Sequence, residues 1–332
     1  MTRLLSFAAL AIGLSAGAAC AEAADCGDVT IAEMTWGSAG LAAHLDKIVL
    51  EEGYGCQVTL VPGYTMPTFT SMNERGEPDL APEMWVDGVR TALEKAASEG
   101  RLIQTVALLS DGGVEGWWIP KFLADANPKI RTVQDALKYP DLFPASDNGR
   151  KGAITNCPTG WNCHVTTENL YRALNAEERG FQLVQTRSAA ELDGSIAKAF
   201  EEKTGWLGYY WAPTATLGKY DMVKLSFNVP HDNMEWNRCT AIPGCEHPKA
   251  NAYPVSDVQT VVTRRFADKA GVAMEYVQTR TWDNQTVGKV LAWMDEEQAT
   301  SEDGAKYFLK TYPDIWTKWV PPHVAKKIKA SL

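Results

Sequence analysis

The chain has 332 residues, 45% of them hydrophobic, which is enough apolar material for two lobes rather than one core. Its formal net charge of −9 at pH 7 argues against nucleic acid as a partner, because nucleic-acid-binding proteins carry a basic face. The charged residues are spread along the chain without a run, a pattern typical of general solubility.

The N-terminus has the pattern of a secretory signal peptide over residues 1–23. Arg3 supplies a cationic start, residues 4–17 are largely apolar, and the small-residue segment 21–23 fits an A-x-A cleavage site. The apolar run is shorter than the roughly 18 residues that a transmembrane helix needs. We therefore expect an exported, soluble mature chain.

The cysteines that follow the signal peptide are even in number, which in an exported protein favours disulfides. The expected pairs are Cys26 with Cys56, Cys157 with Cys163, and Cys239 with Cys245. The last two pairs each enclose a short loop, while the first pair opens two predicted strands. Zinc is the alternative, but neither short loop has CxxC spacing, so no metal is expected.

The first third of the chain alternates between strand and helix patterns. Strands are expected at 29–32, 57–61, 80–84 and 103–108, and helices at 41–52, 65–74 and 89–99. This alternation is typical of an α/β protein with a mostly parallel sheet. We assign residues 24–115 to the first part of lobe 1.

The middle segment repeats the scheme. Strands are expected at 116–120 and 207–211, helices at 132–137, after Cys163 and at 189–203, and a loop at 146–152. A strand at 253–264 is expected to cross back, with helices from Phe266 onward. We assign 116–254 to lobe 2 and 255–332 to the returning part of lobe 1. Ligands of open α/β sheets bind beyond the carboxyl ends of strands, so the loops there are candidate sites.

Twelve tryptophans is a high count, and several of them follow strands or lie in loops. The candidates for a shared site are Trp36, Trp85, Trp117, Trp118, Trp161 and Trp211. The others, Trp206, Trp236, Trp282, Trp293, Trp316 and Trp319, are expected to be core residues.

Clustered indole faces suit a quaternary ammonium group, which is attracted to the ring and has no N–H for ordinary hydrogen bonds. Three or four faces contribute on the order of 3 to 6 kcal/mol. Micromolar binding needs about 8 kcal/mol, so polar groups at the other end of the ligand must supply the rest.

Four motifs carry a family resemblance: Cys157-Pro158-Thr159-Gly160-Trp161-Asn162-Cys163, Tyr209-Tyr210-Trp211-Ala212-Pro213, Met84-Trp85 and Tyr253-Pro254-Val255-Ser256. In these motifs the chain resembles the glycine betaine and proline-betaine binding proteins of ABC importers and their trimethylamine N-oxide-binding relatives. The resemblance implies a two-lobed periplasmic-binding-protein fold of type II, with each lobe a mostly parallel sheet flanked by helices and the ligand in the interlobe cleft. It further implies a periplasmic monomer without cofactor or enzymatic activity, and a membrane permease as partner.

The family resemblance also implies roles for single residues. Tryptophans hold the trimethylammonium group in that family, and backbone N–H groups, here those of Asn162 and Cys163, hold the carboxylate. Some members add a histidine, which is missing after Trp85 and Trp211. Glu115, at the expected hinge, would repel a carboxylate but suits choline or, if protonated, the oxygen of an N-oxide. Trimethylamine N-oxide is therefore the foremost candidate, followed by glycine betaine and choline.

Glu115 could also be a solvated or salt-bridged surface residue with no part in the site. Other functions remain as alternatives as well. A sugar-binding protein or a secreted, tryptophan-rich carbohydrate-active enzyme would also explain the aromatic residues, with Glu83 and Asp87, or Glu33 and Glu115, as carboxylate pairs. The sequence has no G-x-S-x-G or HExxH motif, so no enzyme is expected.

Overall fold

The computed structural model describes residues 26–145 and 151–332. Within these residues no helix is both long and apolar enough to cross a bilayer. The expected signal peptide, 1–23, and most of the expected loop at 146–152 lie outside the described residues.

The first sheet has the strand order β2-β1-β3-β11-β4. Its strands are β1 (Asp28–Met34), β2 (Gln57–Gly63), β3 (Leu80–Trp85), β4 (Leu102–Ala107) and β11 (Val258–Thr263). β1 runs parallel to β2 and β3, whereas β11 runs antiparallel to β3 and β4. Every residue of β3 is buried, which explains why its sequence lacks polar alternation.

The second sheet has the order β10-β5-β8-β6-β7, with β9 paired to β5. Its strands are β5 (Gly113–Pro120), β6 (Gly152–Thr155), β7 (Phe181–Val184), β8 (Gly208–Ala212), β9 (Met222–Lys224) and β10 (Val255–Ser256). β6 runs parallel to β7 and β8, and β5 runs antiparallel to β8, β9 and β10.

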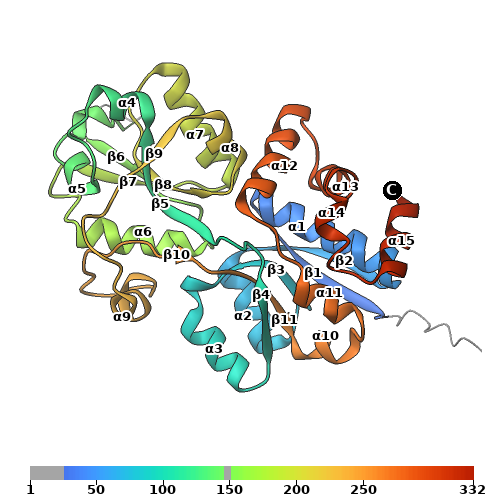
Figure 1. Ribbon diagram of the computed structural model, residues 1–332. Helices are drawn as coiled ribbons and strands as arrows, with labels where there is room; N and C mark the ends of the chain where they lie inside the picture. The colour runs from blue at the N-terminus through green and yellow to red at the C-terminus, as the bar shows by residue number, and fades with distance from the viewer. Residues whose placement is uncertain (1–25, 146–150) are drawn as a thin grey trace, which may run out of the picture.

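Helices surround both sheets (Figure 1). Around the first sheet are α1 (Gly37–Ile48), α2 (Thr65–Arg75), α3 (Arg90–Ser98), α10 (Arg264–Lys269), α11 (Ala273–Thr279), α12 (Asn284–Glu297), α13 (Ser301–Thr311), α14 (Pro313–Trp316) and α15 (Pro322–Ser331). Around the second are α4 (Lys121–Ala126), α5 (Val133–Ala136), α6 (Asn162–Ala173), α7 (Ala189–Glu202), α8 (Ala215–Lys219) and α9 (Asn233–Glu235). The α/β class and the division into two lobes are thus confirmed.

Each sheet is mostly parallel, as predicted, but one strand runs against the others: β11 in the first sheet and β5 in the second. The chain enters the second sheet directly from β4 into β5, and returns directly from β10 into β11. Neither connection contains a helix that would reverse the direction of the chain. β5 and β11 therefore run antiparallel to their neighbours in the sheet that they enter. The predicted lobe limits at 115/116 and 254/255 lie inside β5 and just before β10, and they remain predictions.

The lobes also touch away from the two chain crossings. There α12 of lobe 1 packs beside α8 of lobe 2, and Lys219 Nζ lies 3.4 Å from Asp295 Oδ2 (Figure 1).

Disulfides join all three cysteine pairs expected from the sequence. Cys26–Cys56 lies next to the starts of β1 and β2. Cys157–Cys163 joins the loop after β6 to the first turn of α6, and Cys239–Cys245 closes a second short loop in lobe 2. Both short loops enclose the same length of chain.

Candidate functional site

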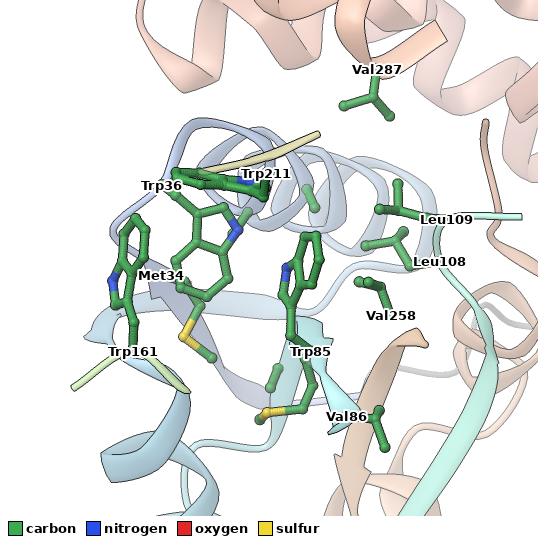
Figure 2. Close-up of a cluster of buried hydrophobic side chains, with 14 of the residues drawn as sticks. Met34, Trp36, Trp85, Val86, Leu108, Leu109, Trp161, Trp211, Val258 and Val287 are labelled. Carbon is green, nitrogen blue, oxygen red and sulfur yellow. The ribbon is translucent and has the colours of Figure 1, made fainter. Parts of the chain in front are cut away.

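A small pocket between the lobes is lined mainly by aromatic side chains. We call it the aromatic pocket; its lining residues are Trp36, Thr65, Trp85, Glu115, Trp161, Asn162, Cys163, Tyr209 and Trp211. Figure 2 shows the four indole side chains gathered together, with Met34 beneath them. Each indole residue is only 5–7% exposed, so a molecule bound there is enclosed by protein.

Each indole of the pocket lies where a strand ends or a helix begins. Trp36 precedes the first residue of α1, and Trp85 is the last residue of β3. Trp161 precedes the first residue of α6, and Trp211 is the penultimate residue of β8. Lobe 1 therefore contributes one pair of indoles and lobe 2 the other.

Trp161 makes edge-to-face contacts with an indole of each lobe. Its ring centroid is 5.2 Å from that of Trp36, with an interplanar angle of 73°. It is 5.1 Å from that of Trp211, at 87°. The ring of Tyr209 lies 6.2 Å from Trp211 at 21°, nearly parallel to it. These angles present both ring edges and ring faces to one small volume.

Hydrogen bonds hold three of the indoles by their N–H groups. Trp36 Nε1 donates to Glu83 Oε1 at 2.6 Å, and Trp85 Nε1 donates to the same oxygen at 3.0 Å. Trp161 Nε1 donates to Thr35 Oγ1 at 3.0 Å. Because the polar edges are satisfied by protein groups, the ring faces are left for apolar or cationic contacts.

Glu115 places a buried carboxyl group in the pocket. Its Oε1 accepts a hydrogen bond from the hydroxyl of Tyr209 at 2.6 Å, and its Oε2 accepts one from the hydroxyl of Ser256. Burial raises the pKa of Glu115 to about 7, although these two hydrogen bonds partly oppose the rise. Only 3% of the residue is exposed, so the solvated surface glutamate considered from the sequence is wrong.

The first turn of α6 supplies backbone donors at the pocket. Asn162 and Cys163 are the first two residues of this helix, and both line the pocket. The first N–H groups of a helix have no partner within it, and they carry the positive end of its dipole. This edge of the pocket therefore suits the electron-rich end of a ligand.

Two of the tryptophans predicted for the site lie outside the pocket. Trp117 is completely buried, and its ring packs 5.5 Å from that of Phe227 in the core of lobe 2. Trp118 points to the other face of β5 and donates its indole N–H to the backbone oxygen of Tyr210 at 2.9 Å. The sequence predicted that Trp117 and Trp118 lie on the crossing strand, but it did not show which part of that strand lines the pocket.

Three contributors were not predicted as site residues: Tyr209, Thr65 and Glu83. Tyr209 lies two residues before Trp211 on β8, so strand periodicity puts both side chains on one face and could have identified it. Thr65, the first residue of α2, has no such signal. Glu83 lies behind the indoles and contacts Trp36 across the fold, a contact that the sequence does not reveal.

The carboxylate pairs that a carbohydrate-active enzyme would need are not assembled around this pocket. Glu33 Oε1 lies 3.0 Å from His44 Nε2, and Asp87 Oδ1 lies 2.6 Å from Arg90 Nη2. Neither acid lines the pocket. The described residues also contain no cluster of histidine, cysteine and acidic side chains that could hold a metal ion.

Comparison with known proteins identifies a family match over most of the chain. Residues 27–311 match the family described as the substrate binding domain of ABC-type glycine betaine transport system. A trimethylamine N-oxide-binding protein of Pelagibacter ubique is 23% identical over 96% of this chain and 99% of its own length.

Solved structures with related folds cover almost all of the chain. A glycine betaine, L-proline ABC transporter binding protein from Borrelia burgdorferi has a TM-score of 0.69 at 17% identity, covering 91% of this chain and 99% of that one. An ABC-transporter choline binding protein in complex with choline has a TM-score of 0.71 at 16% identity, covering 92% and 98%. A lactococcal protein complexed with glycine betaine has a TM-score of 0.66 at 16% identity, covering 89% and 99%. At these identities the likeness shows a shared fold.

Proposed function

Because the chain belongs to the family of substrate-binding domains of ABC-type glycine betaine transport systems, we propose that its aromatic pocket captures a small methylated ammonium compound for delivery to a membrane permease. The convergence of four indoles from two lobes on one enclosed volume carries this proposal. Each favourable cation–π contact contributes roughly 0.5 to 2 kcal/mol, and more when the site is dry.

The proposed roles divide between the two ends of the ligand. Trp36, Trp85, Trp161 and Trp211 form a cage for the methylated ammonium group. Glu115, together with the backbone N–H groups of Asn162 and Cys163, meets the other end. Trp117 and Trp118 have no part in this proposal, because neither lines the pocket.

Trimethylamine N-oxide is the foremost ligand in our proposal. The lining residues in the described part of the chain include no lysine, arginine or histidine to pair with a carboxylate, and they do include a buried acid. A protonated Glu115 can donate a hydrogen bond to an N-oxide oxygen, whereas an ionised Glu115 would repel the carboxylate of glycine betaine. The Pelagibacter relative named for trimethylamine N-oxide supports the same choice.

Glycine betaine and choline are the next candidates, and a sugar is the candidate from another class. A sugar would stack on the indoles, but its many hydroxyl groups need more polar partners than Thr65, Glu115 and Asn162 supply. We also propose that residues 1–23 direct export and that the mature protein acts as a periplasmic monomer.

Titration of the mature protein tests the proposal. Trimethylamine N-oxide, glycine betaine, choline, carnitine and glucose would each be added while tryptophan fluorescence and heat are recorded. We expect binding of methylated ammonium compounds, with trimethylamine N-oxide tightest, and none of glucose. Lack of response to every methylated compound would refute the proposed function, and tighter binding of glycine betaine would refute the choice of ligand.

A further inference from the structure

Glu83 is a buried acid that lies behind the aromatic pocket rather than in it. It belongs to β3 and is 0% exposed. One of its oxygens, Oε1, accepts three hydrogen bonds: from Trp36 Nε1 at 2.6 Å, from Ser38 Oγ at 2.9 Å and from Trp85 Nε1 at 3.0 Å. A single atom thus holds both indoles that lobe 1 contributes to the cage.

This arrangement fixes the angle between two rings that come from different elements. Trp36 lies at the start of α1, and Trp85 lies at the end of β3. Without a shared acceptor, each indole could rotate about its own side-chain bonds. A site that is already ordered loses less free energy when a ligand binds, so the shared acceptor contributes to affinity without touching the ligand.

The same arrangement gives the rings an electrostatic role. Burial raises the pKa of Glu83, while the three hydrogen bonds to Oε1 and the charge of Arg280 oppose that rise and favour the carboxylate. Its other oxygen, Oε2, has no hydrogen-bond partner within the described chain. An indole N–H that donates to a carboxylate is polarised, which leaves more electron density on the ring face that meets a cation. The attraction between carboxylate and cation is also strong in a poorly solvated interior.

We propose that Glu83 is the positioning residue of the cage and the group that makes it prefer a positively charged head over a neutral head of the same shape. This inference rests on the proposed function, because it assumes that the pocket binds methylated ammonium compounds. It assigns to Glu83 a role distinct from that of Glu115, which lines the pocket and faces the ligand.

Pairs of charged and neutral isosteres test this role. Choline would be compared with 3,3-dimethyl-1-butanol, and trimethylamine N-oxide with tert-butanol, by competition measurements on wild type and variants. In Glu83→Gln we expect choline to bind about tenfold more weakly, the scale of one cation–π contact, while the neutral alcohol changes by less than about twofold. The preference for charge is therefore expected to fall.

Two further variants separate charge from position. Glu83→Asp keeps the charge but is too short to reach both indoles. Both members of each pair should therefore weaken, while the part of the preference that comes from direct attraction between carboxylate and cation remains. Thr35→Val removes the neutral acceptor of Trp161 and should likewise alter both members by the same factor. Near-ultraviolet circular dichroism and thermal unfolding establish that each variant is folded, and Glu83→Asp alone still tests the role if Glu83→Gln does not fold.

The outcomes distinguish this inference from the proposed function. If wild type binds neither choline nor trimethylamine N-oxide better than its neutral isostere, the proposed function and the role of Glu83 both fail. If wild type prefers the charged member and Glu83→Gln keeps that preference in full, the role of Glu83 alone is overturned. Complete loss of the preference in Glu83→Asp would also overturn it.

Discussion

Trp161 is the residue at which the indoles of the two lobes meet in the aromatic pocket. Its ring contacts Trp36 of lobe 1 and Trp211 of lobe 2, and its own backbone precedes α6. Removing this side chain therefore removes one ring face of the aromatic pocket. It also leaves Trp36 and Trp211 without a common neighbour.

For Trp161→Ala we expect ligand affinity to fall by about tenfold or more, the equivalent of at least one cation–π contact. Calorimetric titration with trimethylamine N-oxide measures the change. Trp293→Ala is the control. Trp293 belongs to α12, its ring stacks on that of Tyr307 at a centroid distance of 4.1 Å, and it does not line the pocket. Equal affinities of the two variants would remove Trp161 from the site.

We expect Glu115 to make binding depend on pH, with a different sign for different ligands. Burial raises its pKa to about 7, so the neutral acid predominates below that pH and the carboxylate above it. A neutral acid donates to an N-oxide, whereas a carboxylate attracts the cation of choline. We expect the affinity for trimethylamine N-oxide to fall, by up to about tenfold per pH unit, as pH rises above the pKa of Glu115, and the affinity for choline to rise.

Glu115→Gln should remove both pH dependences. The amide keeps a hydrogen-bond donor, so trimethylamine N-oxide should still bind, while choline should bind more weakly and glycine betaine as well as before or better. Titrations at pH 6 and pH 8 compare the three ligands. Unchanged pH profiles in the variant would show that another group titrates.

At the scale of elements, the loop from Cys157 to Cys163 positions the side chain of Trp161. The loop leaves β6 and closes on the first turn of α6, and the backbone N–H of Cys157 donates to Asn156 Oδ1 at 2.8 Å. Cys239–Cys245 closes a loop of equal length elsewhere in lobe 2, outside the pocket. The protein thus contains a matched pair of loops, one with a tryptophan of the aromatic pocket and one without.

Replacing each pair of cysteines by serines should lower the free energy of unfolding by about 2 kcal/mol in both cases, because closed loops of equal length lose equal chain entropy. Only the Cys157→Ser, Cys163→Ser protein should also lose affinity, since its loop no longer holds Trp161. Denaturant unfolding and ligand titration measure the two effects. Equal losses of affinity in both proteins would contradict a specific role for the first loop.

At the scale of the whole molecule, the lobes interlock beside the pocket. Gly88 of lobe 1 lies so close to Asn162 of lobe 2 that an added Cβ would be 1.8 Å from the asparagine side chain. The indole N–H of Trp236, in lobe 2, donates to the backbone oxygen of Asp87 at 3.0 Å. Since the indoles are almost fully buried, ligand access requires the lobes to part, and these contacts must then form again.

Gly88→Ala should prevent complete closure, because overpacking costs about 1 to 3 kcal/mol. We expect affinity to fall at least about fivefold and small-angle scattering to show a more extended protein with ligand present. Gly288→Ala is the control: Gly288 lies in α12 with no atom within 4 Å of an added Cβ, so both properties should stay unchanged. Full closure of Gly88→Ala would contradict the predicted interlock.

The sequence predicted the tryptophans of the aromatic pocket better than it predicted the residues around them. Trp85 and Trp211 were found because each ends a strand, where α/β proteins bind ligands. Glu83 was considered only as half of a carboxylate pair, because its partner Trp36 is 47 residues away in the chain and meets it only in the folded sheet.

In the fold as well, features set by the local sequence were predicted, and features set by contacts distant in the sequence were not. The longer elements were predicted near their observed positions, since each has its own periodicity. β6, β7 and β9 were not, because segments of three or four residues are too short to establish a period. The reversed directions of β5 and β11 also escaped prediction, since strand direction depends on which sheet the chain enters at these two strands.

The edge-to-face contact between Trp36 and Trp161 crosses the boundary between the lobes. Two indoles 5.2 Å apart share their electronic excitation, and this coupling vanishes when they separate. Because one ring belongs to each lobe, the coupling exists only while the cleft is shut. The native protein therefore carries its own optical reporter of opening, which needs no attached dye and would follow each capture and release in real time.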